Sequence, residues 1–320
     1  MKYTICIFSY SRSTSLIMKT QKIPYHFSLN YFHIDYPLWR SIKFIRYLNL
    51  GIKIKFFHGI IFRKTKLFFI NHLKYKFKEP LDSPERTLKH GELIRKKKFL
   101  NNLYKDWYNI FLRELPNLPS GKLIELGSGG GFIKTIEPTI ITSDILALPN
   151  VDMNFSALEM PFEKDEVGAI FMIDTFHHIP NVEKFLTEAL RVLKNGGRII
   201  MIEPANSIWG RFIYKNFHHE PFEINAGWDI PHKGPLSGAN GALPWIVFER
   251  DKNRLYQQFP ELKVQSIKYH TPLLYLVSGG VSYKQLIPSF LYIFFKVIDK
   301  ILPKINKHFS MFVTIDIQKC

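Results

Sequence analysis

The hydrophobic residues between positions 96 and 205 follow two spacings, which predict an alternation of helices and strands. Residues 96–115 and 181–197 repeat apolar side chains at the 3.6-residue period of a buried helix face. Short apolar runs with the length of buried strands stand at 122–126, 139–142, 167–174 and 198–204. Strands that alternate with helices predict a parallel sheet with helices on both faces.

The C-terminal part of the chain predicts two more strands, at 263–270 and 310–318, which we expect to pair at the edge of the sheet. Between them, residues 289–302 place Leu291, Phe294, Phe295, Ile298 and Leu302 at helical spacing, which predicts a helix with a wide apolar face. The expected fold class is therefore α/β. It is a Rossmann-like, doubly wound, mostly parallel sheet with an antiparallel edge strand, a basic N-terminal extension and a lid-like insertion.

A glycine-rich loop follows the first of these strands, in the sequence GKLIELGSGGGFIK at 121–134. Each glycine costs conformational entropy to fix, so the crowding indicates that a ligand approaches the backbone closely. A dinucleotide-binding loop would require glycine at position 132, which is Phe132. Pro138 follows soon after the loop, so we expect only a single helical turn there.

The spacing E-x-G-x-G-x-G resembles the first motif of the class I S-adenosylmethionine-dependent methyltransferases, in particular the type 11 group. The resemblance implies S-adenosyl-L-methionine as the cofactor. It implies that Glu125 binds the amino group of the cofactor, that the glycine loop passes along its tail, and that Asp144 accepts the ribose hydroxyls. The segment SALEMPF at 156–162 is similar to the one that flanks the adenine in this family. The implied cofactor-binding residues are Glu125, Gly127, Ser128, Gly129, Gly131, Asp144, Ser156, Ala157 and Leu158.

The segments FMIDTFHHIP and ALRVLKNGGRIIMIEP resemble the fourth strand, helix and fifth strand of the same group. Asp174 either caps a strand end or faces the methyl donor. One of His177 and His178 packs or bonds to the backbone, and the other is a candidate general base because an imidazole titrates near neutral pH. The candidate catalytic residues are thus Asp174, His177 and His178.

Residues 217–251 resemble the substrate-side insertion of a bacterial subgroup of these enzymes whose substrate is unassigned. His218, His219, Glu220 and Trp245 are therefore candidate substrate contacts. We expect no metal site, because ligands that are adjacent in sequence seldom share one ion. The glycine- and proline-rich segment 234–245 predicts a loop, and its apolar end favours a lid over a linker.

Charge divides the chain into two parts. The net charge is +17, and residues 1–100 hold 21 Lys and Arg against 5 Asp and Glu. We expect a basic, aromatic-rich extension at 1–85 and a methyltransferase domain at 90–320, with insertions at about 205–260 and 271–309. The extension is interpreted as a helical appendage of biased composition or as a peripheral membrane contact. Nucleic-acid binding ranks third, because no recognised binding motif accompanies the charge.

The expected function is methyl transfer from S-adenosylmethionine to oxygen, nitrogen or carbon of a small-molecule or lipid-linked acceptor. The alternatives are an RNA- or DNA-directed methyltransferase that uses the basic N-terminus, a non-catalytic domain that binds the cofactor, and a nicotinamide oxidoreductase, which the glycine spacing disfavours. Two cysteines give no disulfide framework, and neither a signal peptide nor a membrane span is expected. We therefore expect a cytoplasmic location, with peripheral contact at the inner face of a membrane as a further hypothesis.

Overall fold

The computed structural model describes residues 5–8, 18–21, 72–231, 234–305 and 307–320. The chain divides into two compact units, 1–61 and 62–320. In the described part of the first unit, strands β1 (Ile5–Phe8) and β2 (Met18–Gln21) pair antiparallel. Most of the predicted basic extension lies outside the described residues, so its membrane and nucleic-acid interpretations stay predictions.

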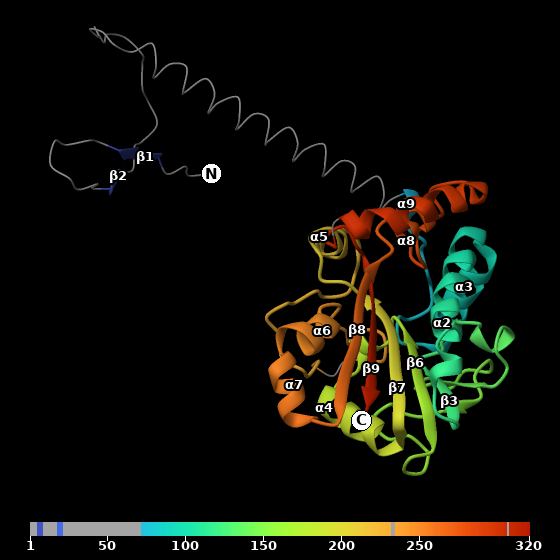
Figure 1. Ribbon diagram of the computed structural model, residues 1–320. Helices are drawn as coiled ribbons and strands as arrows, with labels where there is room; N and C mark the ends of the chain where they lie inside the picture. The colour runs from blue at the N-terminus through green and yellow to red at the C-terminus, as the bar shows by residue number, and fades with distance from the viewer. Residues whose placement is uncertain (1–4, 9–17, 22–71, 232–233, 306) are drawn as a thin grey trace, which may run out of the picture. The chain divides into compact units, whose positions relative to one another are not determined.

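The second unit is built on one seven-stranded sheet with the strand order β5-β4-β3-β6-β7-β9-β8 (Figure 1). Its strands are β3 (Lys122–Leu126), β4 (Ile140–Asp144), β5 (Met153–Asn154), β6 (Val167–Ile173), β7 (Leu193–Pro204), β8 (Leu262–His270) and β9 (Phe312–Lys319). Strands β3 to β7 pair in parallel, whereas β9 runs antiparallel to both β7 and β8. The predicted Rossmann-like sheet with an antiparallel edge is therefore confirmed.

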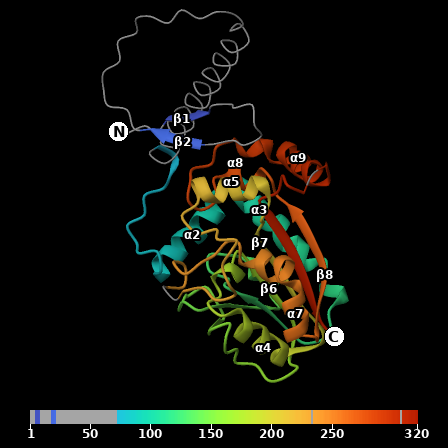
Figure 2. The same cartoon turned by 90° about the vertical axis from the view of Figure 1, so that its left-hand side faces the viewer.

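Helices cover both faces of the sheet. They are α2 (Pro84–Lys96), α3 (Lys98–Leu112), α4 (Val182–Val192), α5 (Ile208–Phe217), α6 (Leu243–Trp245), α7 (Lys252–Gln258), α8 (Leu274–Ser278) and α9 (Tyr292–Ile305). Shorter turns are η2 (Leu115–Asn117), η3 (Ile133–Thr135), η4 (Phe176–His178), η5 (Ile246–Arg250) and η6 (Ser289–Leu291). Helices α2 and α3 lie on one side of the sheet, α4, α6 and α7 on the other, and α5, α8 and α9 gather at one end (Figures 1 and 2).

The core forms where apolar runs from both layers meet. Every residue of β6 is buried, as expected of a central parallel strand that is covered on both faces. Helix α3 buries Phe99, Trp107 and Phe111 on the face turned to the sheet, and the Phe111 ring stacks on Phe171 of β6. Among the helices of the described residues, none is both long and apolar enough to cross a bilayer.

The predicted helix at 96–115 corresponds to α3, which begins at Lys98 and ends at Leu112; a second helix, α2, precedes it, and Lys97 separates the two. Lys97 has extended backbone angles, and its ammonium group donates hydrogen bonds to the carbonyl oxygens of Gly280 and Tyr283. Helix α2 was not expected, although Ser83 before Pro84 is a typical helix start. The Ser83 hydroxyl accepts a hydrogen bond from the Arg86 amide at 3.2 Å. Similarly, the helix predicted at 181–197 ends at Val192, because β7 already begins at Leu193.

Helix α2 packs directly on the glycine-rich loop, backbone against backbone. A Cβ atom added to Gly91 would lie 2.8 Å from the Cα atom of Gly130, and one added to Gly130 would lie 2.4 Å from the Gly91 nitrogen. One glycine of the loop, Gly130, is therefore required for the close packing of α2. The turn after the loop is the single 3₁₀ turn η3, which confirms the expectation drawn from Pro138.

Candidate functional site

A cavity of ≈ 330 Å³ opens at the carboxyl ends of β3, β4 and β6. This is where ligands bind in open α/β sheets. Its wall comes from the glycine-rich loop, from α2, from the turn after β6, and from two segments of the insertion, around 218–220 and 234–238. Residues far apart in the sequence thus face one enclosed volume, which we call the central cavity.

Strand β3 delivers Glu125 to the floor of the central cavity. The side chain is 2% exposed, and its Oε2 atom has no hydrogen-bond partner among the described residues. Burial raises the pKa of this carboxyl to about 7. An unpaired buried carboxylate oxygen is costly, so the position favours a cationic or donor group of a ligand.

The glycine-rich loop turns sharply beside Glu125. Gly127 and Gly129 have φ angles of 64° and 46°, which is the left-handed region that glycine adopts without strain. A Cβ atom at Gly127 would also lie 2.4 Å from the Thr175 side chain. These two glycines, together with Ser128 and Gly131, form part of the cavity wall.

Asp144 stands at the end of β4, opposite the glycine-rich loop. Its Oδ2 accepts a hydrogen bond from the Gly129 amide at 3.0 Å, and its Oδ1 accepts one from the Leu146 amide at 2.9 Å. Each oxygen keeps a second lone pair for a ligand hydroxyl. Ser156, Ala157 and Leu158 line the same cavity, and the Ser156 hydroxyl accepts from the Leu158 amide at 3.2 Å.

Asp174 and His178 form the cavity wall beyond the end of β6. Asp174 has a φ of 54°, a conformation that aspartate tolerates better than most residues, and burial raises its pKa to about 7. His178 Nδ1 lies 3.0 Å from the Gly238 carbonyl oxygen, which can only accept, so this nitrogen carries the proton. Burial lowers the pKa of His178 to about 4, which leaves the ring neutral at pH 7.

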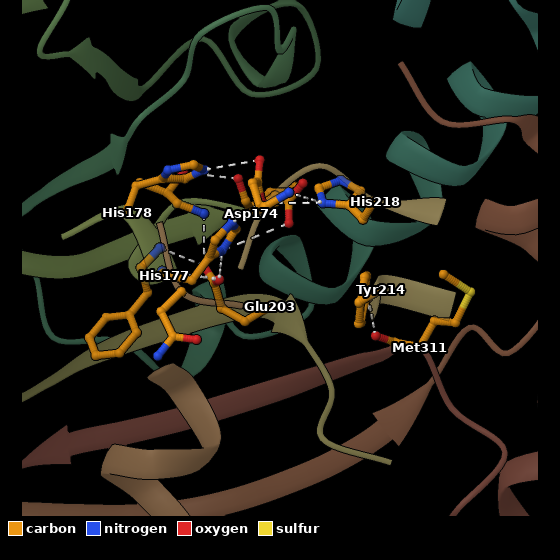
Figure 3. A network of polar contacts seen from close by, with 12 residues as sticks. Asp174, His177, His178, Glu203, Tyr214, His218 and Met311 are labelled. Atoms are coloured by element: carbon orange, nitrogen blue, oxygen red, sulfur yellow. Dashed lines mark hydrogen bonds and ion pairs between the residues drawn. The ribbon is translucent and has the colours of Figure 1, made fainter. Parts of the chain in front are cut away.

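His177 lies behind this wall, between two carboxylates (Figure 3). It is 1% exposed and does not line the central cavity. Its Nδ1 is 2.7 Å from Glu203 Oε2, and its Nε2 is 3.1 Å from Glu220 Oε2. Although burial opposes a charged ring, the Glu203 and Glu220 carboxylates raise the pKa of His177 well above its ordinary value. This geometry suits positioning better than direct proton transfer to a ligand.

Glu203, at the end of β7, organises the turn after β6. Its side chain is fully buried, and its Oε1 accepts hydrogen bonds from the amides of Thr175 at 2.8 Å and Phe176 at 2.7 Å. The sequence reasoning did not select Glu203. An acidic residue inside the apolar run RIIMIEP was the available signal, because a buried carboxylate needs dedicated partners.

The insertion at about 205–260 covers one side of the central cavity. Gly234, Pro235, Leu236 and Gly238 line it, as expected of a lid. Asp82 holds this loop, because its Oδ1 accepts from the amides of Leu236 at 2.8 Å and Ser237 at 2.7 Å. Like Glu203, Asp82 was not selected from the sequence, since its partners lie about 155 residues away.

The candidate substrate residues separate into two groups. His218, His219 and Glu220 line the central cavity. Trp245 does not. It packs against the hydrophobic core at the end of α6, so the structure gives it no contact with the cavity.

A second cavity, of ≈ 270 Å³ and almost wholly apolar lining, lies next to the first; we call it the apolar pocket. Helix α5 provides Trp209, Phe212, Ile213, Tyr214 and Phe217, and the α8 region provides Tyr275, Leu276, Gly279, Gly280, Ser282, Tyr283 and Leu286. His218, Tyr275 and Ser282 line both cavities. These three residues therefore form the partition between the central cavity and the apolar pocket.

Comparison with known proteins gives a family match for part of the chain. Residues 141–201 match the family model described as a methyltransferase domain. No curated protein matches the sequence. The similar solved structures include geranyl diphosphate C-methyltransferase from Streptomyces coelicolor A3(2), with 15% identity, 69% of this chain and 81% of that chain covered, and a TM-score of 0.39. An S-adenosylmethionine-dependent methyltransferase from Mesorhizobium loti shows 12% identity, 66% and 96% coverage, and a TM-score of 0.37.

Proposed function

Because the chain carries a class I methyltransferase domain, we propose that it binds S-adenosylmethionine in the central cavity and transfers the methyl group to a small-molecule or lipid-linked acceptor. The single observation that carries this proposal is Glu125 Oε2, a buried oxygen at the end of β3 that has no hydrogen-bond partner among the residues that the structure describes. It lies beside glycines in the left-handed region, where the chain can approach a ligand.

The cofactor pose follows from three groups of the central cavity. Glu125 faces the amino group of the methionine part, and Asp144 accepts the two ribose hydroxyls with the lone pairs left by Gly129 and Leu146. The segment 156–158 then borders the adenine. The sulfonium methyl group is left toward Asp174 and His178, on the side where the insertion closes the cavity.

The transfer itself needs little chemistry from the protein. The acceptor attacks the methyl carbon, the carbon–sulfur bond breaks, and S-adenosylhomocysteine leaves. In-line alignment supplies ~7–11 kcal/mol of the barrier. An acceptor that bears a proton releases it to a base, which adds ~10²–10⁴-fold in rate. Asp174 and His178 line the cavity and are the two candidate bases, whereas His177 keeps a positioning role.

The apolar pocket favours an acceptor with a hydrocarbon chain. A head group in the central cavity would lie on one side of His218 and Tyr275, and the chain would extend into the pocket on the other side. Burial of apolar surface stabilises such a complex by ~25 cal/mol per Å². A wholly polar acceptor would leave the apolar pocket unoccupied.

Exposed apolar side chains on α5, which lines the apolar pocket, and on α9 and η6 are consistent with access from a membrane. They are Ile208, Phe212, Phe290, Ile293, Phe294, Val297 and Ile301. Exposed lysines belong to the same helices or follow them: Lys215 lies on α5, Lys300 and Lys304 lie on α9, and Lys307 follows α9. Lysines beside apolar side chains suit the anionic face of a bilayer, where each cation contributes ~1 kcal/mol.

The test is transfer of a tritiated methyl group from S-adenosylmethionine into a total lipid extract, compared with an aqueous small-molecule extract. We expect label in the organic phase. Leu286→Glu, which puts a charge at the solvent-exposed edge of the apolar pocket, should lower that transfer and leave cofactor binding unchanged. Ile136→Glu, at an exposed apolar residue outside both cavities, is the matched control and should have no effect.

Label found in the aqueous extract alone, with Leu286→Glu as active as the wild type, would contradict the lipid-linked acceptor but retain the methyltransferase. No label in either extract, despite cofactor binding, would favour a non-catalytic cofactor-binding domain.

A further inference from the structure

Five side chains from two distant segments converge beside the central cavity. His177 and His178 belong to η4, and His218, His219 and Glu220 follow α5. The ligand-type atoms of His177, His178 and Glu220 lie within 4.8 Å of one another, and so do those of His218, His219 and Glu220. Glu220 is common to both sets.

Glu220 is the centre of this cluster. One oxygen, Oε2, lies 3.1 Å from His177 Nε2, and the other, Oε1, lies 3.8 Å from His178 Nε2 and 3.6 Å from His219 Nε2. In a tetrahedral zinc site with bonds of ~2.1 Å, neighbouring ligand atoms are roughly 3.4 Å apart. The distances from the Glu220 oxygens to the three histidine nitrogens, 3.1, 3.6 and 3.8 Å, lie on both sides of this spacing.

The two η4 histidines also have the outer partners that metal ligands require. Histidine ligands usually donate the second ring N–H to a carboxylate or a backbone carbonyl, which fixes the ring and its tautomer. His177 Nδ1 is 2.7 Å from Glu203, and His178 Nδ1 is 3.0 Å from the Gly238 carbonyl oxygen. Each ring therefore directs Nε2 to Glu220.

We propose that His177, His178 and Glu220 bind a divalent first-row transition metal, of which Zn²⁺ is the representative. Two imidazoles and one carboxylate form a ligand set that suits zinc and iron rather than magnesium or calcium. His178 and Glu220 line the central cavity, so the fourth position is open to it. His219 or a bound molecule can complete the coordination there.

His177 and His178 are adjacent in the sequence, whereas Glu220 comes from a segment 43 residues away, so only the fold brings the three ligands together. Without a metal, His177 would be a cation that holds one proton toward each carboxylate. In the metal-free cluster a proton lies between His177 and Glu220, whereas in the proposed site a metal ion lies there.

A metal at this place would also complement the proposed methyl transfer, and this catalytic role, unlike the metal site, rests on the proposed function. The open position can hold an oxygen of the acceptor and lower its pKa, as a Lewis acid does. With His178 as a ligand, Asp174 remains as the base. The metal site itself does not depend on the reaction.

The experiment is a calorimetric titration of the full chain with ZnCl₂ after dialysis against a chelator, with MgCl₂ as the comparison. We expect one Zn²⁺ per chain and no saturable heat from Mg²⁺. Co²⁺ in place of Zn²⁺ should give visible absorption bands that report nitrogen and oxygen ligands. The full chain without saturable Zn²⁺ binding would overturn the proposal, whatever the variants do.

Two variants locate the ion. Glu220→Gln and His178→Gln should each weaken Zn²⁺ binding at least ~10–100-fold, which is the loss that even outer partners cause. His270→Gln is the matched control, because its ring nitrogens bond to Thr271 and Thr314 instead. Unchanged affinity in both cluster variants, with folding checked by circular dichroism, would place the ion elsewhere and contradict the site.

Discussion

Below pH 7 the affinity for S-adenosylmethionine falls about tenfold for each pH unit, because the Glu125 carboxyl takes up a proton. Burial raises the pKa of Glu125 to about 7 in the free protein, and only the ionised form attracts the ammonium group of the cofactor. The cofactor stays cationic in this range, since an α-amino group titrates at ~7.7–8.0. Affinity should therefore be highest between about pH 7 and pH 8.

The effect of Glu125 on the affinity must be distinguished from the effects of the other ionisable groups around it. Asp144 on β4 lies across the loop and adds like charge, and burial keeps Tyr104 and Tyr108 of α3 neutral by raising their pKa. Glu125→Gln removes the titrating group but keeps its shape. Calorimetric affinities of this variant should be weak between about pH 5 and pH 7 and should vary less with pH than those of the wild type, because Asp174, whose pKa burial also raises to about 7, then titrates beside the cofactor without Glu125. A wild-type affinity without any pH dependence in that range would show that Glu125 does not meet the ammonium group.

Replacing Glu203 by alanine should lower the free energy of unfolding by about 3–5 kcal/mol. The change removes a fully buried carboxylate and leaves the amides of Thr175 and Phe176 and the His177 ring without their acceptor. Each buried donor left unpaired costs about 1–3 kcal/mol. Denaturant unfolding, with the slope compared between variants, measures the loss.

Two further variants serve as references for the loss of unfolding free energy in Glu203→Ala. Glu203→Gln keeps one acceptor oxygen for the two amides and should lose less than the alanine variant. Glu261→Ala, at an exposed glutamate, should stay within about 0.5 kcal/mol of the wild type. A loss below about 1 kcal/mol in Glu203→Ala would contradict the view that this carboxylate holds the turn after β6.

The sheet and its ligand-binding edge were predictable from the sequence because they depend on local patterns. Continuous apolar runs indicate buried parallel strands, and the spacing of Glu125, the glycines and Asp144 follows from one strand–loop–strand unit. Helix α2 was not predicted because it spans the expected boundary between the extension at 1–85 and the domain at 90–320, although Ser83 and Pro84 mark a helix start.

The partners that complete the site were not predictable, because tertiary packing alone brings them together. Nothing local indicates that Glu220 meets His177 across 43 residues, or that Asp82 holds the loop at 236–237. Gly91 gave no signal either, since its need for a bare Cα arises only against Gly130. Trp245 is the opposite case: this aromatic residue beside the predicted lid packs against the core and does not line the central cavity.

Binding of the cofactor in the central cavity is tested by a calorimetric titration with S-adenosylmethionine and S-adenosylhomocysteine on the wild type, Gly129→Val and Asp144→Ala. We expect one molecule to bind per chain and both substitutions to abolish binding. A valine at a φ of 46° distorts the loop, and the loss of Asp144 removes the ribose acceptor. No binding by a folded wild-type sample, or undiminished binding in both variants, would contradict this expectation.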